Sequence, residues 1–171
     1  MEHGLLDVAQ QRCAAYQYFA DAFRYPQHET AEKQERQLQY IANFECSAHQ
    51  GACSLHEATY STEGQEVLYE ELTRFYEFFG LKRDHRAELP DHLTVELEFM
   101  HYLSFREAHV AGGEQAKESL VKAQRDFVDR HLRHLVTGVL ETFPGSSGHY
   151  RELLDDLSVF INDEKRYLIT N

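Results

Sequence analysis

Apolar residues recur along this chain at intervals of three and four, the spacing that keeps side chains on one face of an α-helix. A first helix is predicted to end before Pro26, with an inward face of Leu5, Val8, Ala9, Tyr16, Phe19, Ala20 and Phe23. A second runs from about Thr30 to Phe44, with Leu38, Ile41 and Phe44 inward. The stretch from Cys46 to Tyr60 has no sustained stripe and is interpreted as a loop with room for one short helix.

The middle of the chain carries two further helices separated by a loop. Thr62 is the expected N-cap of the first, with Gln65 three residues on in a capping-box position. Its stripe is Val67, Leu68, Leu72, Phe75 and Phe79, and Gly80 is placed to end it. After a charged loop from Leu81 to Pro90, Asp91 is the expected N-cap of the next helix. That helix carries Leu93, Leu97, Met100 and Leu103 on one face.

The C-terminal third predicts a long helix and a final one. Gly112-Gly113 precede the long helix, whose stripe is Leu120, Phe127, Leu132, Leu135, Val136, Val139 and Leu140. Ser147 is a candidate cap for the last helix, which carries Leu153, Leu154, Leu157, Phe160 and Ile161. No segment shows sustained strand alternation flanked by hairpin turns. The pattern therefore predicts an all-α fold, a bundle of six or seven helices forming one domain over residues 1–171.

The net charge narrows the classes of partner. Seventeen basic residues face 29 acidic ones, and the formal net charge is −12. Such a chain repels nucleic-acid phosphates and anionic membrane surfaces, which argues against nucleic-acid binding and membrane insertion. Basic protein segments are the favoured partners. Acidity that merely maintains solubility is the alternative interpretation.

Hydropathy and cysteine use indicate a cytoplasmic protein. No apolar stretch reaches the roughly 18 residues that span a bilayer. Residues 1–4, Met-Glu-His-Gly, lack the basic start of an export signal. The three cysteines, Cys13, Cys46 and Cys53, are an odd number and fit reduced thiols.

Eleven histidines in an acidic chain raise the question of a metal site. Cys46, His49, Cys53 and His56 read C-x2-H-x3-C-x2-H, and these ligand types suit zinc. On one continuous helix the first and last would lie about 15 Å apart, too far to share an ion. A loop that happens to hold these residues is the preferred interpretation, and no metal is predicted.

Other candidate chemistry is weaker. Glu98 and His101 form one E-x-x-H pair, whereas di-iron bundles need two such pairs and two further glutamates. His131 and His134 are interpreted as surface residues of the long helix. Nucleophile-elbow, phosphate-loop and dinucleotide motifs are all missing from the sequence. The chain is therefore not expected to be an enzyme or to bind a cofactor.

One segment concentrates acidic residues at the start of a helix. It reads Glu88-Leu89-Pro90-Asp91-His92 and continues to Met100. Pro90 restricts the residue before it to extended conformations, so the segment is predicted to be a loop-to-helix junction. The junction holds more carboxylate side chains than are required to cap the helix.

This segment resembles the E-P-x-D-H signature of the redox-enzyme maturation chaperones, the TorD/DmsD/NarJ-like family, although the proline stands one place later. Three other stretches are similar to the family more weakly: residues 16–23, 69–75 and 127–132. The second has an altered order, and the tryptophan often found after the third is missing because the chain has no Trp. Within the family, the block from Glu88 to Met100 looks most like the chaperones of dimethyl sulfide and ethylbenzene dehydrogenase-type enzymes.

The resemblance implies a cytoplasmic, all-helical chaperone. Such proteins bind the apo catalytic subunit of a molybdopterin-containing oxidoreductase, often at its twin-arginine signal peptide, until the cofactor is inserted. The partner-binding residues expected in this chain are carboxylates and neighbours at the junction and aromatic residues of a groove. They are Glu88, Pro90, Asp91, His92, Glu96, Tyr16, Phe19, Tyr76 and Phe79.

Two other classes stay open at this point. One is a metal-binding bundle that uses Cys46, His49, Cys53 and His56, and the other is a generic helical adaptor. The identity of the client and the oligomeric state are not given by the sequence.

Overall fold

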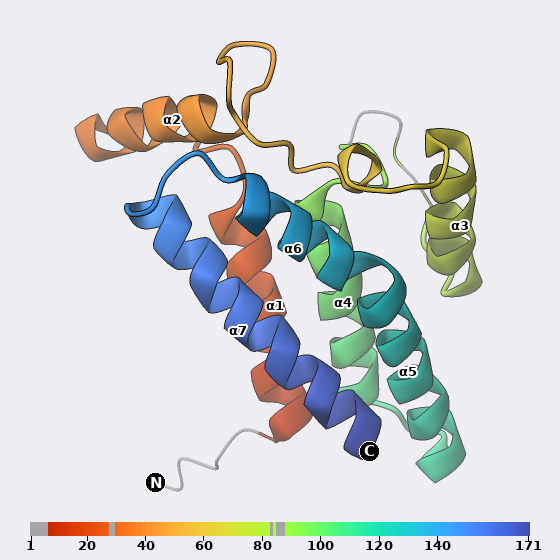
Figure 1. Cartoon of the computed structure of the whole chain (residues 1–171). Coiled ribbons are helices and arrows are strands. Elements are labelled where there is room, and N and C mark those ends of the chain that lie inside the picture. The colour runs from red at the N-terminus through yellow and green to blue at the C-terminus, as the bar shows by residue number, and fades with distance from the viewer. Residues whose placement is uncertain (1–6, 28–29, 83, 85–87) are drawn as a thin grey trace, which may run out of the picture.

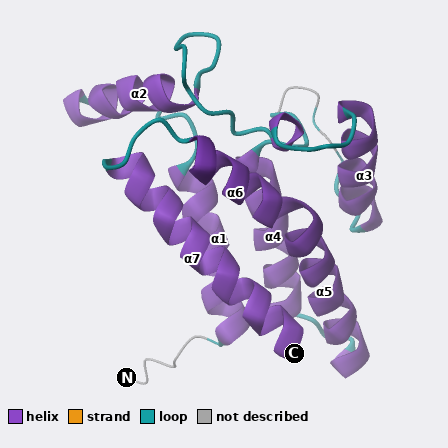
Figure 2. Cartoon of the chain, in the orientation of Figure 1, coloured by secondary structure: helices purple, strands orange, loops and turns teal. Residues whose placement is uncertain are grey.

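The computed structural model describes residues 7–27, 30–82, 84 and 88–171. Its helices are α1 (Val8–Ala22), α2 (Ala31–Phe44), α3 (Gln65–Phe78), α4 (Leu93–Ala108), α5 (Gly113–Phe127), α6 (Arg133–Thr142) and α7 (His149–Thr170). A 3-10 turn, Glu57–Thr59, precedes α3, and a π turn, Val128–Leu132, joins α5 to α6. Helices dominate the described ranges, which contain no strand beyond an isolated bridge between His56 and His92 (Figure 2). The all-α prediction is confirmed.

Five helices form the main bundle, and two lie outside it. Helices α1, α4, α5, α6 and α7 run alongside one another, whereas α2 lies across one end and α3 stands at the side (Figure 1). Helix α1 packs along α4, and α7 contacts α5 and α6. Helix α3 is connected to α4 by the chain that carries Glu88, so this junction lies where the side helix meets the bundle.

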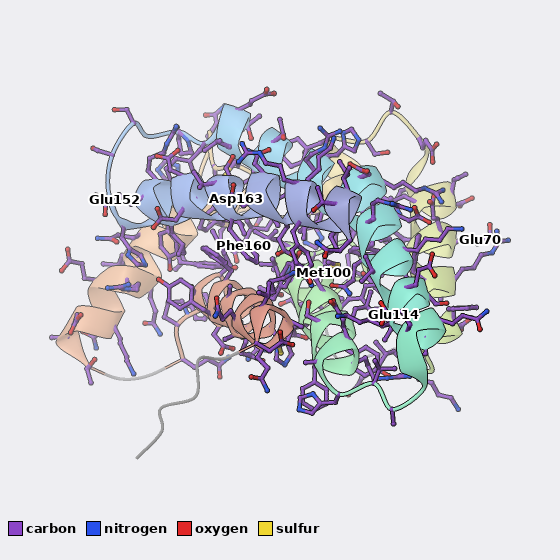
Figure 3. All side chains as sticks on the ribbon, turned by 90° about the horizontal axis from the view of Figure 1, so that it is seen from below. Glu70, Met100, Glu114, Glu152, Phe160 and Asp163 are labelled. Carbon is purple, nitrogen blue, oxygen red and sulfur yellow. The ribbon has the colours of Figure 1, made fainter. Side chains whose placement is uncertain are left out.

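Aromatic side chains fill the space between α1 and α7. Tyr16 and Phe19 pack their rings 4.8 and 5.5 Å from that of Phe160. Viewed from below, Phe160 and Met100 lie between the helices, while Glu70, Glu114 and Glu152 lie at the periphery (Figure 3). The stripes read from the sequence therefore mark the buried side of most helices.

Three residues assigned to the inward faces lie outside the core. Val8 is 48% exposed, Leu38 69% and Val67 56%. On α2 the buried anchors are Tyr40 and Phe44, and Leu38 stands two positions from Tyr40, which places it about 200° round the helix. Leu5 lies outside the described residues.

Two predicted helix starts are displaced along the chain. Helix α3 has Gly64 rather than Thr62 at its N-cap, because the Glu63 amide donates to Ser61 Oγ (3.1 Å) in a local turn. Helix α7 has Gly148 at its N-cap, one residue after the expected Ser147. Local sequence therefore located these helix starts only to within two residues.

The end of α3 is as predicted. Gly80 has a φ of +79°, the left-handed conformation that glycine adopts readily. The Gly80 amide donates to the Glu77 carbonyl (2.9 Å), and the Leu81 amide donates to that of Tyr76 (3.0 Å). These two bonds form a Schellman motif, which satisfies the last carbonyls of the helix.

The π turn changes the surroundings of His131. Buried residues follow at every fourth position, Phe127, His131, Leu135 and Val139. On an α-helix, a four-residue step advances about 40° beyond a full turn, so the wider π turn keeps the series facing the interior. His131 is 1% exposed, and the interpretation of this residue as a surface histidine is wrong; His134 is exposed as expected.

A buried arginine joins four helices of the bundle. Arg12 on α1 donates to Glu164 on α7 through Nε (2.7 Å) and Nη2 (2.9 Å). Its remaining bonds reach Glu107 on α4 (2.7 Å) and Gln124 on α5 (2.6 Å). Burial lowers the pKa of Arg12, but Glu164 and Glu107 together raise it above its ordinary value. The guanidinium is thus charged, and each of its three nitrogens donates at least one hydrogen bond, which a buried cation requires.

None of the helices in the described part of the chain has the length and apolarity to cross a bilayer. Residues 1–4, which lack the basic start of an export signal, lie outside the described ranges.

Candidate partner-binding site

The junction before α4 is held by backbone bonds to a segment that lies far back in the sequence. The Glu57 amide donates to the Asp91 carbonyl (2.9 Å), and the Leu93 amide donates to the Leu55 carbonyl (2.8 Å). From α3, the Tyr76 hydroxyl donates to the carbonyl of Pro90 (2.7 Å). The start of α4 is therefore fixed from two sides, by the chain that precedes the 3-10 turn and by α3.

Asp91 does not cap α4, and that prediction is wrong. Its carboxylate turns away from the helix, accepting a bond from the Ala58 amide (3.1 Å) and lying 3.0 Å from His56 Nδ1. Burial raises the pKa of Asp91, but the bonds from His56 and Ala58 outweigh it, and the pKa lies below its ordinary value. Asp91 is thus an ionised, fully buried group that ties the junction to the 3-10 turn.

His92 takes the capping position instead. Its Nδ1 accepts a bond from the Thr94 amide (3.3 Å). Burial, together with the neighbouring His56, lowers the pKa of His92 to about 4. The ring is therefore neutral at neutral pH, which leaves a ring nitrogen free to accept.

Behind the junction lies an acid cluster, which consists of Glu57, Glu96 and His131. Glu57 and Glu96 are 4% and 0% exposed, and their carboxyl groups interact. Burial and the charge of Glu57 raise the pKa of Glu96 well above its ordinary value. His131 Nδ1 lies 3.2 Å from both carboxylate oxygens of Glu57, and its Nε2 lies 3.3 Å from Glu71. Protonation of Glu96 thus relieves its repulsion with Glu57, which His131 also approaches.

A groove opens between α3 and α4 beside the junction. This α3–α4 groove has a volume of about 370 Å³. Its apolar and aromatic lining comprises Tyr76, Leu81, Pro90, Val95, Phe99 and Tyr102. Charged residues also line it, namely Glu77, Lys82, Asp84, Glu88 and Glu98. The described lining is thus apolar with an acidic excess, and it suits a segment that is apolar and basic.

The predicted binding residues separate into three groups. Glu88, Pro90 and Tyr76 line the α3–α4 groove. Asp91, His92 and Glu96 are buried beside it at the start of α4, where they position the junction.

The third group lies away from the groove lining, with Tyr16 and Phe19 buried and Phe79 half-buried. Tyr16 and Phe19 are 0% and 6% exposed between α1 and α7, and the Tyr16 hydroxyl donates to Glu164 (2.9 Å). Phe79 packs its ring 5.9 Å from that of Phe99 and is not among the groove residues. The nine residues therefore do not form one surface, and apart from Tyr76 the aromatic lining of the groove comes from other positions.

Sequence reasoning missed Val95, Phe99 and Tyr102 on α4. They follow one another at intervals of four and three, beside the buried stripe of Leu93, Leu97 and Met100. A helix with two adjacent apolar stripes has more apolar surface than one neighbour covers. The second apolar stripe is therefore the sequence feature that could have identified these three residues.

The cysteine–histidine cluster has other partners. His56 is bound to Asp91, Cys53 is buried, and Cys46 is exposed with its thiol 3.5 Å from the Ala52 carbonyl. Burial raises the pKa of the Cys53 thiol to about 12, which disfavours the thiolate that binds metals. Across the described ranges, no three Cys, His, Asp or Glu side chains converge as ion ligands.

Comparison with known proteins shows the family. The model of the nitrate reductase delta subunit family matches residues 6–140. A selenate reductase assembly chaperone from Thauera selenatis is 36% identical over 152 residues, which cover 76% of this chain and 75% of the relative. A perchlorate reductase assembly chaperone from Dechloromonas aromatica is 31% identical over 132 residues, covering 76% and 58%.

A dimethyl sulfide dehydrogenase assembly chaperone from Rhodovulum sulfidophilum is 37% identical over 73 residues, covering 40% of this chain and 29% of the relative. The predictions of a redox-enzyme chaperone family and of a chaperone rather than an enzyme are confirmed. The chain belongs to the nitrate reductase delta subunit family, and these three relatives are assembly chaperones.

Proposed function

We propose that this chain binds the apo catalytic subunit of a molybdopterin-containing oxidoreductase at its N-terminal twin-arginine signal region. It holds that subunit in the cytoplasm until the cofactor is inserted, and export follows. The names of the relatives, which are chaperones of selenate and perchlorate reductases, support a client of this class.

The observation that carries the proposal is the composition of the α3–α4 groove. A signal region combines a basic start with an apolar run of about 7–15 residues. The apolar run requires apolar surface, which Tyr76, Val95 and Tyr102 provide. The basic start requires carboxylates, which Glu77 and Glu88 place in the same groove.

The test is co-purification of the catalytic subunit from cells that cannot synthesise molybdopterin. We expect the wild-type chaperone to retain the apo subunit, and to release it when molybdopterin synthesis is restored. Val95→Asp introduces a charge into the apolar groove and should abolish retention. Val159→Asp makes the same change on α7, where the side chain is 62% exposed, and should retain the subunit.

Salt separates the two components of binding. Charge pairs at the edge of an interface are screened within about 8–10 Å at ordinary ionic strength, whereas apolar burial persists. Raising the salt concentration should therefore weaken retention without abolishing it. If the wild-type protein retained no catalytic subunit in the molybdopterin-deficient cells, the proposal would be wrong.

A further inference from the structure

A second pocket lies on the other side of Glu88. This α2 pocket has a volume of about 530 Å³. It extends from the end of α2 to the junction before α4, and its principal lining residues are Tyr25, Tyr40, Phe44, Glu45, His56 and Glu88. Because Glu88 lines both pockets, the α2 pocket adjoins the α3–α4 groove at this residue.

One wall of the α2 pocket is a row of aromatic rings. The ring of Tyr40 lies 5.4 Å from that of Tyr25 and 5.2 Å from that of Phe44, and both pairs meet edge to face. Tyr40 and Phe44 are buried in this row, while Tyr25 is 41% exposed. The row therefore fixes Tyr25 from behind and leaves part of its ring open to a ligand.

The pocket also holds two carboxylates, Glu45 at the end of α2 and Glu88 at the junction. Among the described residues, neither of them makes an ion pair. Both carboxylates are near enough to Tyr40 to add to the effect of burial in raising its pKa. Of the pocket's two histidines, His92 is neutral, whereas His56 is paired with Asp91. The pKa of His56 is raised by that bond and also by the charges of Glu88 and Glu45.

We infer that the α2 pocket is a subsite for one arginine side chain of the client's basic segment, with Tyr25, Glu45 and Glu88 as its specificity-determining residues. This inference rests on the proposed function and locates the basic start of the signal region. A planar guanidinium stacks on an aromatic ring and binds a carboxylate through two parallel bonds. A lysine ammonium is a point charge that makes no planar stack, so the subsite should prefer arginine to lysine.

The experiment measures fluorescence anisotropy of labelled synthetic peptides with the full-length protein. Each peptide has an apolar run of about ten residues, and it is preceded by Arg-Arg, by Lys-Lys or by Gln-Gln. We expect the wild-type protein to bind the Arg-Arg peptide most tightly. Glu45→Gln should weaken that peptide about tenfold, the usual effect of losing a hydrogen bond to a charged group, and leave the Gln-Gln peptide unchanged.

Two matched comparisons separate the subsite from general charge and from folding. Glu35→Gln removes the same charge from an exposed position on α2 that does not line the pocket, and it should have little effect. Tyr25→Phe keeps the aromatic face and should preserve the preference for arginine over lysine. Tyr25→Leu removes that face and should reduce the preference.

The outcomes distinguish this inference from the proposed function. Equal binding of the Arg-Arg and Lys-Lys peptides to the wild-type protein would overturn the arginine subsite, as would equal effects of Glu45→Gln and Glu35→Gln. In either case, peptide binding that is still lost in Val95→Asp would leave the proposed function standing. If none of the three peptides bound and no catalytic subunit co-purified, the proposed function would fail as well.

Discussion

The molecule buries two charged clusters that are built on opposite principles. Around Arg12, one guanidinium satisfies two carboxylates and an amide from three other helices. In the acid cluster, the carboxyl groups of Glu57 and Glu96 lie close together. Among the described residues, His131 is the nitrogen partner of Glu57. In the first cluster the carboxylates face a cation, whereas in the second two carboxyl groups face each other and the ionisation of Glu96 is disfavoured. The unfavourable cluster lies beside the candidate site, where acids with shifted pKa values are often found.

The largest effect should come from breaking the Arg12 cluster. Arg12→Met leaves Glu107 and Glu164 buried without a cation, which typically costs about 3–5 kcal/mol of unfolding free energy. Urea denaturation monitored by circular dichroism measures this loss. Arg24→Met is the matched control, because Arg24 pairs with Asp21 and Glu98 on the surface. It should cost less than about 1 kcal/mol, and equal losses would contradict the distinction between the two arginines.

The acid cluster should be revealed by the dependence of stability on pH. Glu57 and Asp91 face Glu96, and burial and Glu57 raise its pKa well above the ordinary 4.5. The folded state therefore holds a proton that the unfolded state releases. This contribution to stability is complete below about pH 4.5 and is lost as the pH rises towards the pKa in the folded state.

Glu96→Gln supplies a donor to Glu57 and does not titrate. The unfolding free energy of the variant should fall less steeply from about pH 5 to about pH 8, by up to about 1.4 kcal/mol per pH unit. Tyr76 and His131 also face the cluster and are unchanged in the comparison. Parallel pH profiles for the wild-type and variant proteins would show that Glu96 carries no proton at neutral pH.

A smaller effect is expected where the junction meets the acid cluster. His56→Ala removes one bond from the buried Asp91 and leaves the bond from the Ala58 amide, so it should cost about 1 kcal/mol. Because Asp91 raises the pKa of His56, this contribution is present below about pH 6.5 and declines as the pH rises further. His134→Ala, an exposed position on α6, should leave the unfolding free energy unchanged.

The fold could be predicted because burial of one face of each helix places apolar residues at a regular spacing. That spacing is visible in a single sequence. The same signal misled the site prediction. Tyr16 and Phe19 form an aromatic stripe. Such a stripe indicates contact with apolar neighbours, but it does not distinguish a buried core from an open groove. They pack against Phe160, about 140 residues further along the chain, which no local pattern reveals.

Polar residues at the junction illustrate the same limit. Asp91 has the right type and position for an N-cap, but His56, 35 residues earlier, and the Ala58 amide bind its carboxylate instead. Glu88 was predicted because the junction motif is a local feature, and Tyr76 because it is an aromatic residue beside the α3 stripe. Tyr25 and Glu45 were missed because only the tertiary structure brings the ends of α1 and α2 to the junction.

The π turn has a consequence for how this chain tolerates changes in length. It accommodates one more residue per turn than an α-helix does, so α5 and α6 form one continuous rod with two helical phases. Deleting a single residue there would let the turn become α-helical while α6 keeps its orientation. A deletion within α6 before Gly138 would instead rotate the residues that follow by about 100°. That rotation would bring a side chain against the ring of Tyr60, which an added Cβ at Gly138 would approach to within 2.3 Å of Cγ. Single-residue deletions should therefore be accepted at the π turn and rejected within the α-helical parts of this rod.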